Sequence, residues 1–150
     1  MTTNNSCNYS LGNVNDQLVM TSSGVQGFRG RSQSSSSRSL NTAFQISSTR
    51  DSAAIYSVDI SCTSTLAGGQ SGTVFLEMAT NSGFTTGVQT LSEFTNSNSV
   101  SLAIAISVTQ INTACLYTPL IPAGNWVRLR TNNNTGTPTF NFQTGQEVLL

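Results

Sequence analysis

The feature that most restricts the fold of this chain is a strict alternation of apolar and polar residues in short runs. In Ala54–Thr63 every even position from Tyr56 to Cys62 is apolar, and the odd positions between them are polar. Successive side chains of a β-strand point to opposite faces of the sheet, so this pattern predicts a strand with one face against a core. No long window repeats its apolar residues every 3.6 positions, which argues against helices.

Comparable runs recur along the chain and are rich in the β-branched and aromatic residues that strands favour. The further predicted strands are Leu40–Ile46, Thr73–Thr80, Val100–Val108, Trp126–Thr131 and a final pair of short strands led by Phe140 and Phe142 and ending at Val148–Leu150. A short turn near Val108–Ala114 is the one helical element expected. The predicted fold class is all-β: an antiparallel, jelly-roll-like β-sandwich in a single domain.

The length of 150 residues fits one domain. Residues 1–16 are polar and are predicted to form a short N-terminal docking arm, which leaves 17–150 as the β-sandwich domain. The serine-rich segment Arg31–Ser39 is predicted as a polar loop between the two parts. The run Asn132–Gly136 lies between two alternating segments and predicts the turn of a hairpin.

Charge and hydropathy exclude several partners. Charged residues make up 8 % of the chain and its formal net charge is zero, so the basic surface that nucleic acids require is missing. No apolar run approaches the roughly 20 residues of a membrane-spanning helix, so membrane insertion is not expected. The N-terminus has neither a basic start nor an apolar stretch, so no secretory signal peptide is expected.

The residue types that most enzymes depend on are scarce. The chain has no histidine and no lysine, which removes the usual general base and Schiff-base chemistry. A pair of carboxylates remains as an alternative for hydrolysis, with Asp51 and Asp59 closest in sequence. Arg50 beside Asp51 is more simply a local ion pair at the start of a strand. The sequence therefore predicts a protein that is not an enzyme, with no catalytic residue, metal ligand set or cofactor.

Three cysteines leave an odd thiol and form no CxxC pair. Cys62 lies at an apolar position of the alternating run and is predicted to be a small buried side chain. A disulfide between Cys62 and Cys115 stays open at this level, as does cross-linking of subunits through Cys7.

Two sets of surface residues are candidates for function. The predicted subunit interface consists of Phe44, Tyr56, Leu102, Ile104, Trp126 and Phe140. The predicted ligand or receptor contacts are Arg128, Arg130 and Asn133. An alternative function is a carbohydrate-binding, lectin-like module, because such sites combine exposed aromatic rings with amide and guanidinium donors. Trp126 is equally well explained as a structural residue.

Six segments carry a resemblance to a known class of proteins. They are Arg38–Gln45, Tyr56–Ile60, Gly68–Val74, Ile121–Leu129, Gly136–Phe140 and Gly145–Leu150. With them, the stretch from Gly27 to Leu150 resembles the small β-domains of tailed-bacteriophage structural proteins, such as tail fibres, spikes and head fibres or decorations.

That resemblance implies a non-enzymatic virion protein, made in the host cytoplasm and exposed on the outer surface of the particle. It implies a homotrimer with a role in capsid decoration or host attachment, including contact with a host surface glycan. The arm 1–16 would then bind a larger virion protein.

Overall fold

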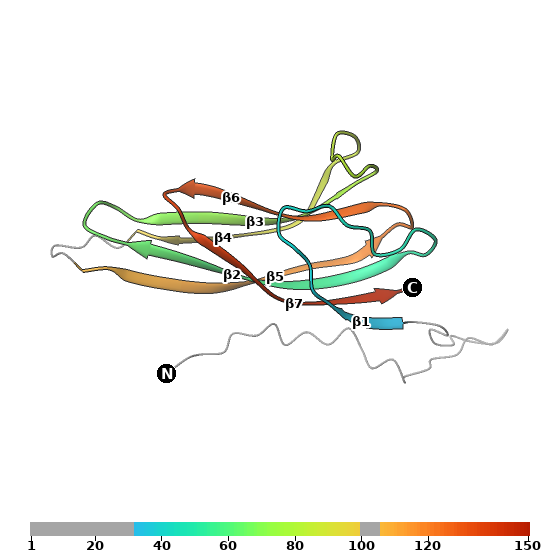
Figure 1. The fold of residues 1–150 in the computed structure, drawn as a ribbon, viewed down its shortest axis with the longest axis horizontal. Helices are drawn as coiled ribbons and strands as arrows, with labels where there is room; N and C mark the ends of the chain where they lie inside the picture. The colour runs from blue at the N-terminus through green and yellow to red at the C-terminus, as the bar shows by residue number, and fades with distance from the viewer. Residues whose placement is uncertain (1–31, 100–105) are drawn as a thin grey trace.

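The computed structural model describes residues 32–99 and 106–150, which form seven strands in two antiparallel sheets (Figure 1). The strands are β1 (Ser32–Ser36), β2 (Ser52–Ser64), β3 (Gln70–Ala79), β4 (Gln89–Asn98), β5 (Val108–Ile121), β6 (Trp126–Thr135) and β7 (Thr139–Leu149). One sheet has the order β1-β7-β2-β5 and the other β4-β3-β6. The predicted all-β sandwich is confirmed. The predicted arm 1–16 lies outside the described residues.

An irregular segment gives the smaller sheet a fourth member along the edge of β6. The Phe44 N–H donates to the Val127 carbonyl at 2.9 Å, and the Val127 N–H donates back at 2.8 Å. The Asn41 N–H likewise donates to the Leu129 carbonyl at 2.8 Å. The predicted strand Leu40–Ile46 therefore forms one isolated bridge rather than a regular strand. With this segment beside β6, the orders β1-β7-β2-β5 and β4-β3-β6 become those of an eight-stranded jelly roll.

The core lies between the two sheets and follows the predicted alternation. The even positions of β2 from Tyr56 to Cys62 are fully buried, and β3 and β6 contribute their own inward faces. The buried apolar cluster consists of Ala54, Tyr56, Val58, Ile60, Cys62, Val74, Leu76, Met78, Ala114, Leu116, Ile121, Val127 and Leu129. These side chains come from both layers of one chain, so the single chain closes its own interior.

The fifth strand replaces the predicted helical turn. Val108–Ala114 is the first half of β5, which pairs with β2 over its whole length. Ala114, Leu116 and Thr118 are buried while the residues between them are exposed, a period of two rather than 3.6. The helical prediction is therefore wrong. Of the predicted strand Val100–Val108, residues 100–105 lie outside the described part of the chain.

Three further predictions about connections are wrong. Asn132–Gly136 does not turn a hairpin, because β6 and β7 belong to different sheets and their link crosses between the layers. The predicted pair of C-terminal strands is one strand, β7, whose register shifts between Thr144 and Phe142 opposite β2. The serine-rich segment predicted as a loop contains β1, which pairs with β7. Backbone hydrogen bonds need no apolar side chain, so polar sequence can still form a strand.

Two asparagines connect β4 to the opposite sheet, at the end of β4 where its inward side chains are no longer apolar. The Asn96 side-chain amide donates to the Ile60 carbonyl at 2.8 Å, and that of Asn98 donates to the Val108 carbonyl at 2.8 Å. Both side chains are buried. Because each amide satisfies a carbonyl across the sandwich, this end of the interior is closed by hydrogen bonds.

The described cysteines answer one open question. Cys62 is a free, fully buried thiol, as predicted, and burial raises its pKa. Cys115 takes part in a disulfide, and since Cys62 is free, the Cys62–Cys115 bridge is not formed. Cys7 lies outside the described residues.

Candidate functional site

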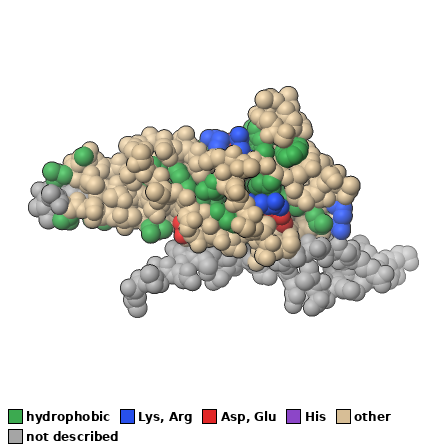
Figure 2. All heavy atoms as spheres, in the orientation of Figure 1, with side chains coloured by type: hydrophobic (Ala, Val, Ile, Leu, Met, Phe, Trp, Pro, Cys, Tyr) green, Lys and Arg blue, Asp and Glu red, His purple; other side chains and the backbone are tan. Residues whose placement is uncertain are grey.

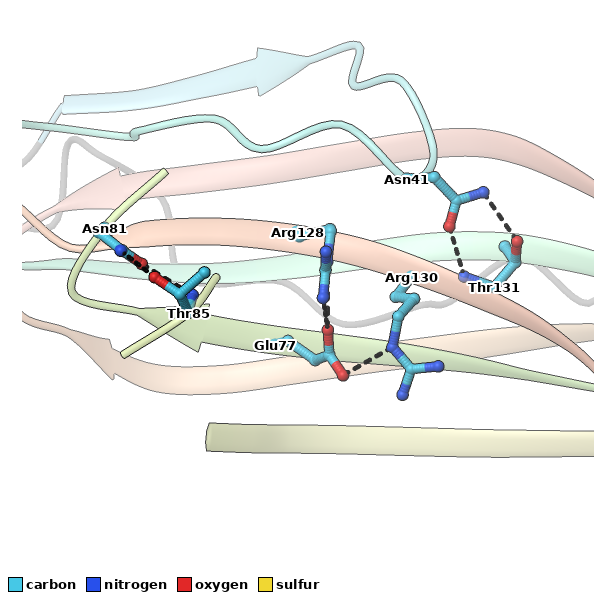
Figure 3. Close-up of polar contacts among 7 residues, drawn as sticks. All are labelled: Asn41, Glu77, Asn81, Thr85, Arg128, Arg130 and Thr131. Atoms are coloured by element: carbon cyan, nitrogen blue, oxygen red, sulfur yellow. Dashed lines mark hydrogen bonds and ion pairs between the residues drawn. The ribbon is translucent and has the colours of Figure 1, made fainter. Parts of the chain in front are cut away.

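A cluster of two arginines and one glutamate lies on the outer face of the β4-β3-β6 sheet (Figure 3). Side chains alternate along β6, so Arg128 and Arg130 point away from the core that Val127 and Leu129 enter. Glu77 lies beside them on β3, opposite Arg128 in the register. Arg128 donates from Nη2 to Glu77 Oε2 at 2.7 Å and from Nε at 3.2 Å. Arg130 donates from Nε to Glu77 Oε1 at 2.8 Å.

Aromatic rings shield this cluster from water. The Arg128 guanidinium lies over the Phe84 ring at 4.2 Å, and the Arg130 guanidinium lies over the Phe75 ring at 4.0 Å. A cation over a ring face is attracted by the ring quadrupole, and the stack fixes the guanidinium plane. The Glu77 side chain is left 5 % exposed. A carboxylate this deeply buried is tolerated because both its oxygens accept charged hydrogen bonds.

The charges of the cluster do not cancel. Two guanidinium groups face one carboxylate, which leaves one net positive charge. Arg128 makes two hydrogen bonds to Glu77 whereas Arg130 makes one. Within residues 32–99 and 106–150, the two terminal nitrogens of Arg130 have no hydrogen-bond partner. Arg130 is therefore the cation of the pair that is free to bind a second anion.

The pKa of Glu77 sets a dependence of stability on pH. Burial raises this pKa, but the hydrogen bonds and charges of Arg128 and Arg130 outweigh burial and lower it below the ordinary value. A lowered folded-state pKa stabilises the fold above the unfolded pKa, and that stabilisation is lost as pH falls through the folded value.

We therefore expect the wild type to exceed Glu77→Gln in stability by about 1–2 kcal/mol at neutral pH, and the difference to shrink below about pH 4. Thermal unfolding of both proteins from neutral pH to pH 3 or so measures it. Glu93→Gln, at an exposed position of the neighbouring strand, is the control and should show no such trend. A difference that stays constant on acidification would contradict the ion pair.

The connection between β3 and β4 stands out from the sheet (Figure 1). Phe84, which covers Arg128, has a φ of 52°, a left-handed conformation that costs a bulky residue about 1 kcal/mol. Asn81 holds the turn: its Oδ1 accepts from the Thr85 N–H at 3.0 Å and its Nδ2 donates to Thr85 Oγ1 at 2.6 Å. The strained turn places the ring over the arginine.

A second left-handed residue flanks the other side of β6. Asn41 has a φ of 60°, and its side chain accepts from the Thr131 N–H at 2.8 Å and donates to Thr131 Oγ1 at 2.9 Å (Figure 3). Among the described residues, Asn41 and Phe84 are the non-glycine residues with positive φ. Phe84 contacts Arg128 and Asn41 is hydrogen-bonded to Thr131, so both residues touch the strand that carries the arginines. Backbone strain of this kind concentrates at functional sites.

The structure brings two of the three predicted ligand contacts together and separates the third. Arg128 and Arg130 share the outer face, whereas Asn133 alternates to the opposite side of β6. Asn132 and Asn134 occupy the arginines' face instead. The Asn134 Nδ2 donates to Thr73 Oγ1 on β3 at 2.7 Å. Asn133 is exposed and stays a predicted contact, but on the face opposite to the arginines, because a step of one position along a strand changes the face.

Sequence reasoning missed the partners of the arginines. Glu77 and Phe75 share the outward face of their strand, so alternation already placed them away from the core. The pairing of β3 with β6 could not be derived from either strand alone. Phe84 lies in a turn whose conformation no sequence pattern here predicts.

The structure places the predicted interface residues in different environments. Tyr56 is 0 % exposed inside the single chain, so its assignment to a subunit interface is wrong: the side chain has no surface to offer a second copy. Phe44 and Phe140 are partly buried against the same core. Trp126 is half-buried on the outer face of β6, and its role stays a prediction. Leu102 and Ile104 lie outside the described residues.

A second ion pair is structural rather than exposed. Arg38 donates to both oxygens of Glu147, at 2.9 and 2.7 Å, and the Tyr56 hydroxyl donates to Glu147 Oε1 at 2.7 Å. Glu147 is buried. Burial is the largest cause that raises the pKa of Tyr56, with the Glu147 charge next. The network joins β7, β2 and the segment after β1, and both carboxylate oxygens of Glu147 accept hydrogen bonds.

Exposed apolar side chains gather at one end of the sandwich, hereafter the apolar end, defined by Leu66, Ile106, Val108 and Ile111. Leu66 is 62 % exposed and lies in the turn after β2, while Ile111 is 60 % exposed near the start of β5. Val108 lies opposite Ser64 in the register, beside that turn. Figure 2 shows hydrophobic side chains at this end of the molecule. Surface patches of this kind mark interaction sites.

Comparison with known proteins places part of the chain among viral sequences. No family model matches it. Over 109 residues, 72 % of the chain, it is 38 % identical to "Uncharacterized protein 443R" of Invertebrate iridescent virus 6. The match spans 4 % of that protein's length, so the chain corresponds to a small part of it. Among solved structures, "Structure of Eiger TNF from S. frugiperda" is similar over 65 % of this chain and 59 % of that one, with 13 % identity and a TM-score of 0.29, which adds nothing to the fold described above.

The viral relative corrects the expected origin. The sequence pattern resembled tailed-bacteriophage proteins, but the relative belongs to an iridescent virus, which infects eukaryotic hosts, so that expectation is wrong. The segments on which the resemblance rested are alternating strand patterns and turn residues. Unrelated β-domains share these patterns, so they carry little information on ancestry.

Proposed function

We propose that this chain is a non-enzymatic, jelly-roll module of a viral structural protein, exposed on the outer surface of the particle, and that copies associate through the apolar end. The similarity to part of a viral protein supports the viral setting. The match covers a small part of a much longer viral protein, as expected if this fold is one domain among several in that protein. Jelly rolls serve in capsid and lectin domains, which supports the proposal by analogy of fold.

The observation that carries the proposal is the apolar end itself. The chain has few charges, and the two most exposed large apolar side chains of the described residues, Leu66 and Ile111, both lie at this end together with Ile106 and Val108. Covering an apolar side chain gains roughly 25 cal/mol for each Å² removed from water. Zero net charge adds no repulsion between copies. A homotrimer is the assembly that we expect.

The arrangement of the acids favours a role other than hydrolysis. Asp51 and Asp59 are eight positions apart along one extended stretch, a separation of about 26 Å, whereas paired catalytic carboxylates lie about 5–10 Å apart. Glu77 and Glu147 are each held by arginine. No group of three or more Asp, Glu or Cys side chains in the described segments could hold a metal ion, and those segments contain no helix able to cross a membrane.

Light scattering on the intact chain tests the association. The wild type should have three times the 15.8 kDa mass of the chain, and the double variant Leu66→Asp/Ile111→Thr should be monomeric. Threonine keeps the β-branching of Ile111 and so leaves β5 formed. The matched control is Val88→Asp/Leu120→Thr, which alters side chains 46 % and 49 % exposed away from the apolar end. It should keep the wild-type mass.

A monomeric wild type would contradict association, and a mass of two copies would contradict the trimer while keeping the surface. Loss of association in the control as well would contradict the apolar end as the contact. Immunogold labelling of intact viral particles tests the location: label on the outer surface is expected, and label that appears only on disrupted particles would contradict it.

A further inference from the structure

We propose that the outer face of the β4-β3-β6 sheet binds a linear anionic polysaccharide, with Arg130 contacting its carboxylate or sulfate groups. The inference does not depend on how many copies associate, because all the residues involved come from one chain. Figure 2 shows arginine side chains on the face next to the protruding β3–β4 connection.

Arg130 has the free hydrogen-bonding capacity for an anion. Arg128 donates to Glu77 Oε2 from two nitrogens, whereas Arg130 donates to Glu77 Oε1 from its Nε alone. The terminal Nη1 and Nη2 atoms of Arg130 remain, in a guanidinium whose Cζ lies over the Phe75 ring, 4.0 Å from its centre. A fixed guanidinium edge suits a carboxylate or sulfate, since both present two oxygens to parallel N–H groups. The arginine is preorganised, so little side-chain freedom is lost on binding.

The outward residues of β6 form a stripe rather than a pocket. Alternation places Trp126, Arg128, Arg130, Asn132 and Asn134 along one face, over about 26 Å of strand. The stripe runs from an aromatic ring through two cations to two amides. Sugar rings pack their C–H faces on aromatic rings and exchange hydrogen bonds with amides. A long, shallow stripe of these groups suits an extended polymer better than a single sugar.

One nearby charge opposes the ligand and makes the proposal testable in both directions. Glu93 on β4 lies opposite Phe75, which in turn lies opposite Arg130, so its carboxylate is two strands away on the same face. Glu93 is exposed. At this separation its charge weakens the attraction for an anion without bonding to Arg130. Removing the Glu93 charge should strengthen binding, and removing the Arg130 charge should weaken it.

The experiment titrates the full chain at low salt with polygalacturonate, dextran sulfate and uncharged dextran, and follows the fluorescence of Trp126, the single tryptophan. We expect saturable binding to an anionic polymer and none to dextran. Comparing the carboxylated with the sulfated polymer shows which oxyanion fits. Arg130→Gln should weaken binding about tenfold, the loss expected for one charged contact. Glu93→Gln should strengthen it about twofold.

Arg50→Gln is the matched control, because it removes an arginine charge from the segment before β2, where Arg50 donates to the Leu150 carbonyl. It should bind like the wild type. Arg130→Gln removes the bond to Glu77 Oε1 but leaves Glu77 paired with Arg128, so some loss of stability is expected, and a melting temperature well above the temperature of the titration separates a binding defect from a folding defect. The proposal is overturned by equal binding to dextran, by wild-type affinity in Arg130→Gln, or by no binding to either anionic polymer.

Discussion

Replacing Tyr56 with alanine should lower the free energy of unfolding by about 3–5 kcal/mol, the range found when a large buried aromatic side chain is removed. Tyr56 is fully buried, and its ring packs edge-on against Phe44 at 5.9 Å and tilted against Phe142 at 6.4 Å. Gly145 admits the ring, since a Cβ at that position would lie 2.7 Å from it. The hydroxyl also donates to Glu147. Removal therefore leaves a cavity and a buried carboxylate with one partner fewer.

Chemical denaturation measures this loss, and Leu120→Ala is the control. Leu120 is 49 % exposed on β5, so its truncation should change stability by less than about 0.5 kcal/mol. The loss in Tyr56→Ala should also be the same at every protein concentration, because the side chain belongs to the core of one chain. A loss that grew on dilution would return Tyr56 to a subunit interface and contradict the fold described above.

Replacing Arg38 with alanine should destabilise the protein by about 2–3 kcal/mol, because it leaves the buried Glu147 charge with the Tyr56 hydroxyl as its remaining partner. The value lies below that of a fully buried pair because the Arg38 side chain is 26 % exposed. Arg38 also lies over the Phe44 ring at 4.4 Å, so some packing is lost with the charge.

A neutral pair separates the charge from the packing. In Arg38→Met/Glu147→Gln the methionine covers Phe44 and the amide oxygen still accepts from Tyr56, so stability should return to within about 1 kcal/mol of the wild type. Urea denaturation of the single and double variants measures the coupling. A double variant no more stable than Arg38→Ala would mean that the cost does not arise from a stranded charge.

Alternation predicted the strands that have one wet face and one dry face. Val58, Leu76 and Val127 lie inward as expected, because each strand shows the core one side only. Alternation does not predict a strand that is held in the sheet by backbone hydrogen bonds alone. The serines of β1 carry no apolar signal and are held by pairing with β7.

At the candidate site, too, the sequence predicted which face a side chain occupies but not which strand it meets. Alternation places Arg128 and Arg130 on one face, which the structure confirms. Their partner Glu77 follows from the pairing of β3 with β6, and that pairing is a long-range choice that the local sequence does not encode. Phe84 reaches Arg128 through a left-handed turn held by Asn81. Tertiary contacts of this kind are determined by the whole fold.

The account depends most on the interior being complete within one chain, with association outside it. Urea unfolding of the Leu66→Asp/Ile111→Thr variant over about a hundredfold range of protein concentration tests this directly. We expect one cooperative transition whose midpoint does not move with concentration. A variant that is already unfolded, or a midpoint that rises as the protein is concentrated, would show that neighbouring copies supply part of the core.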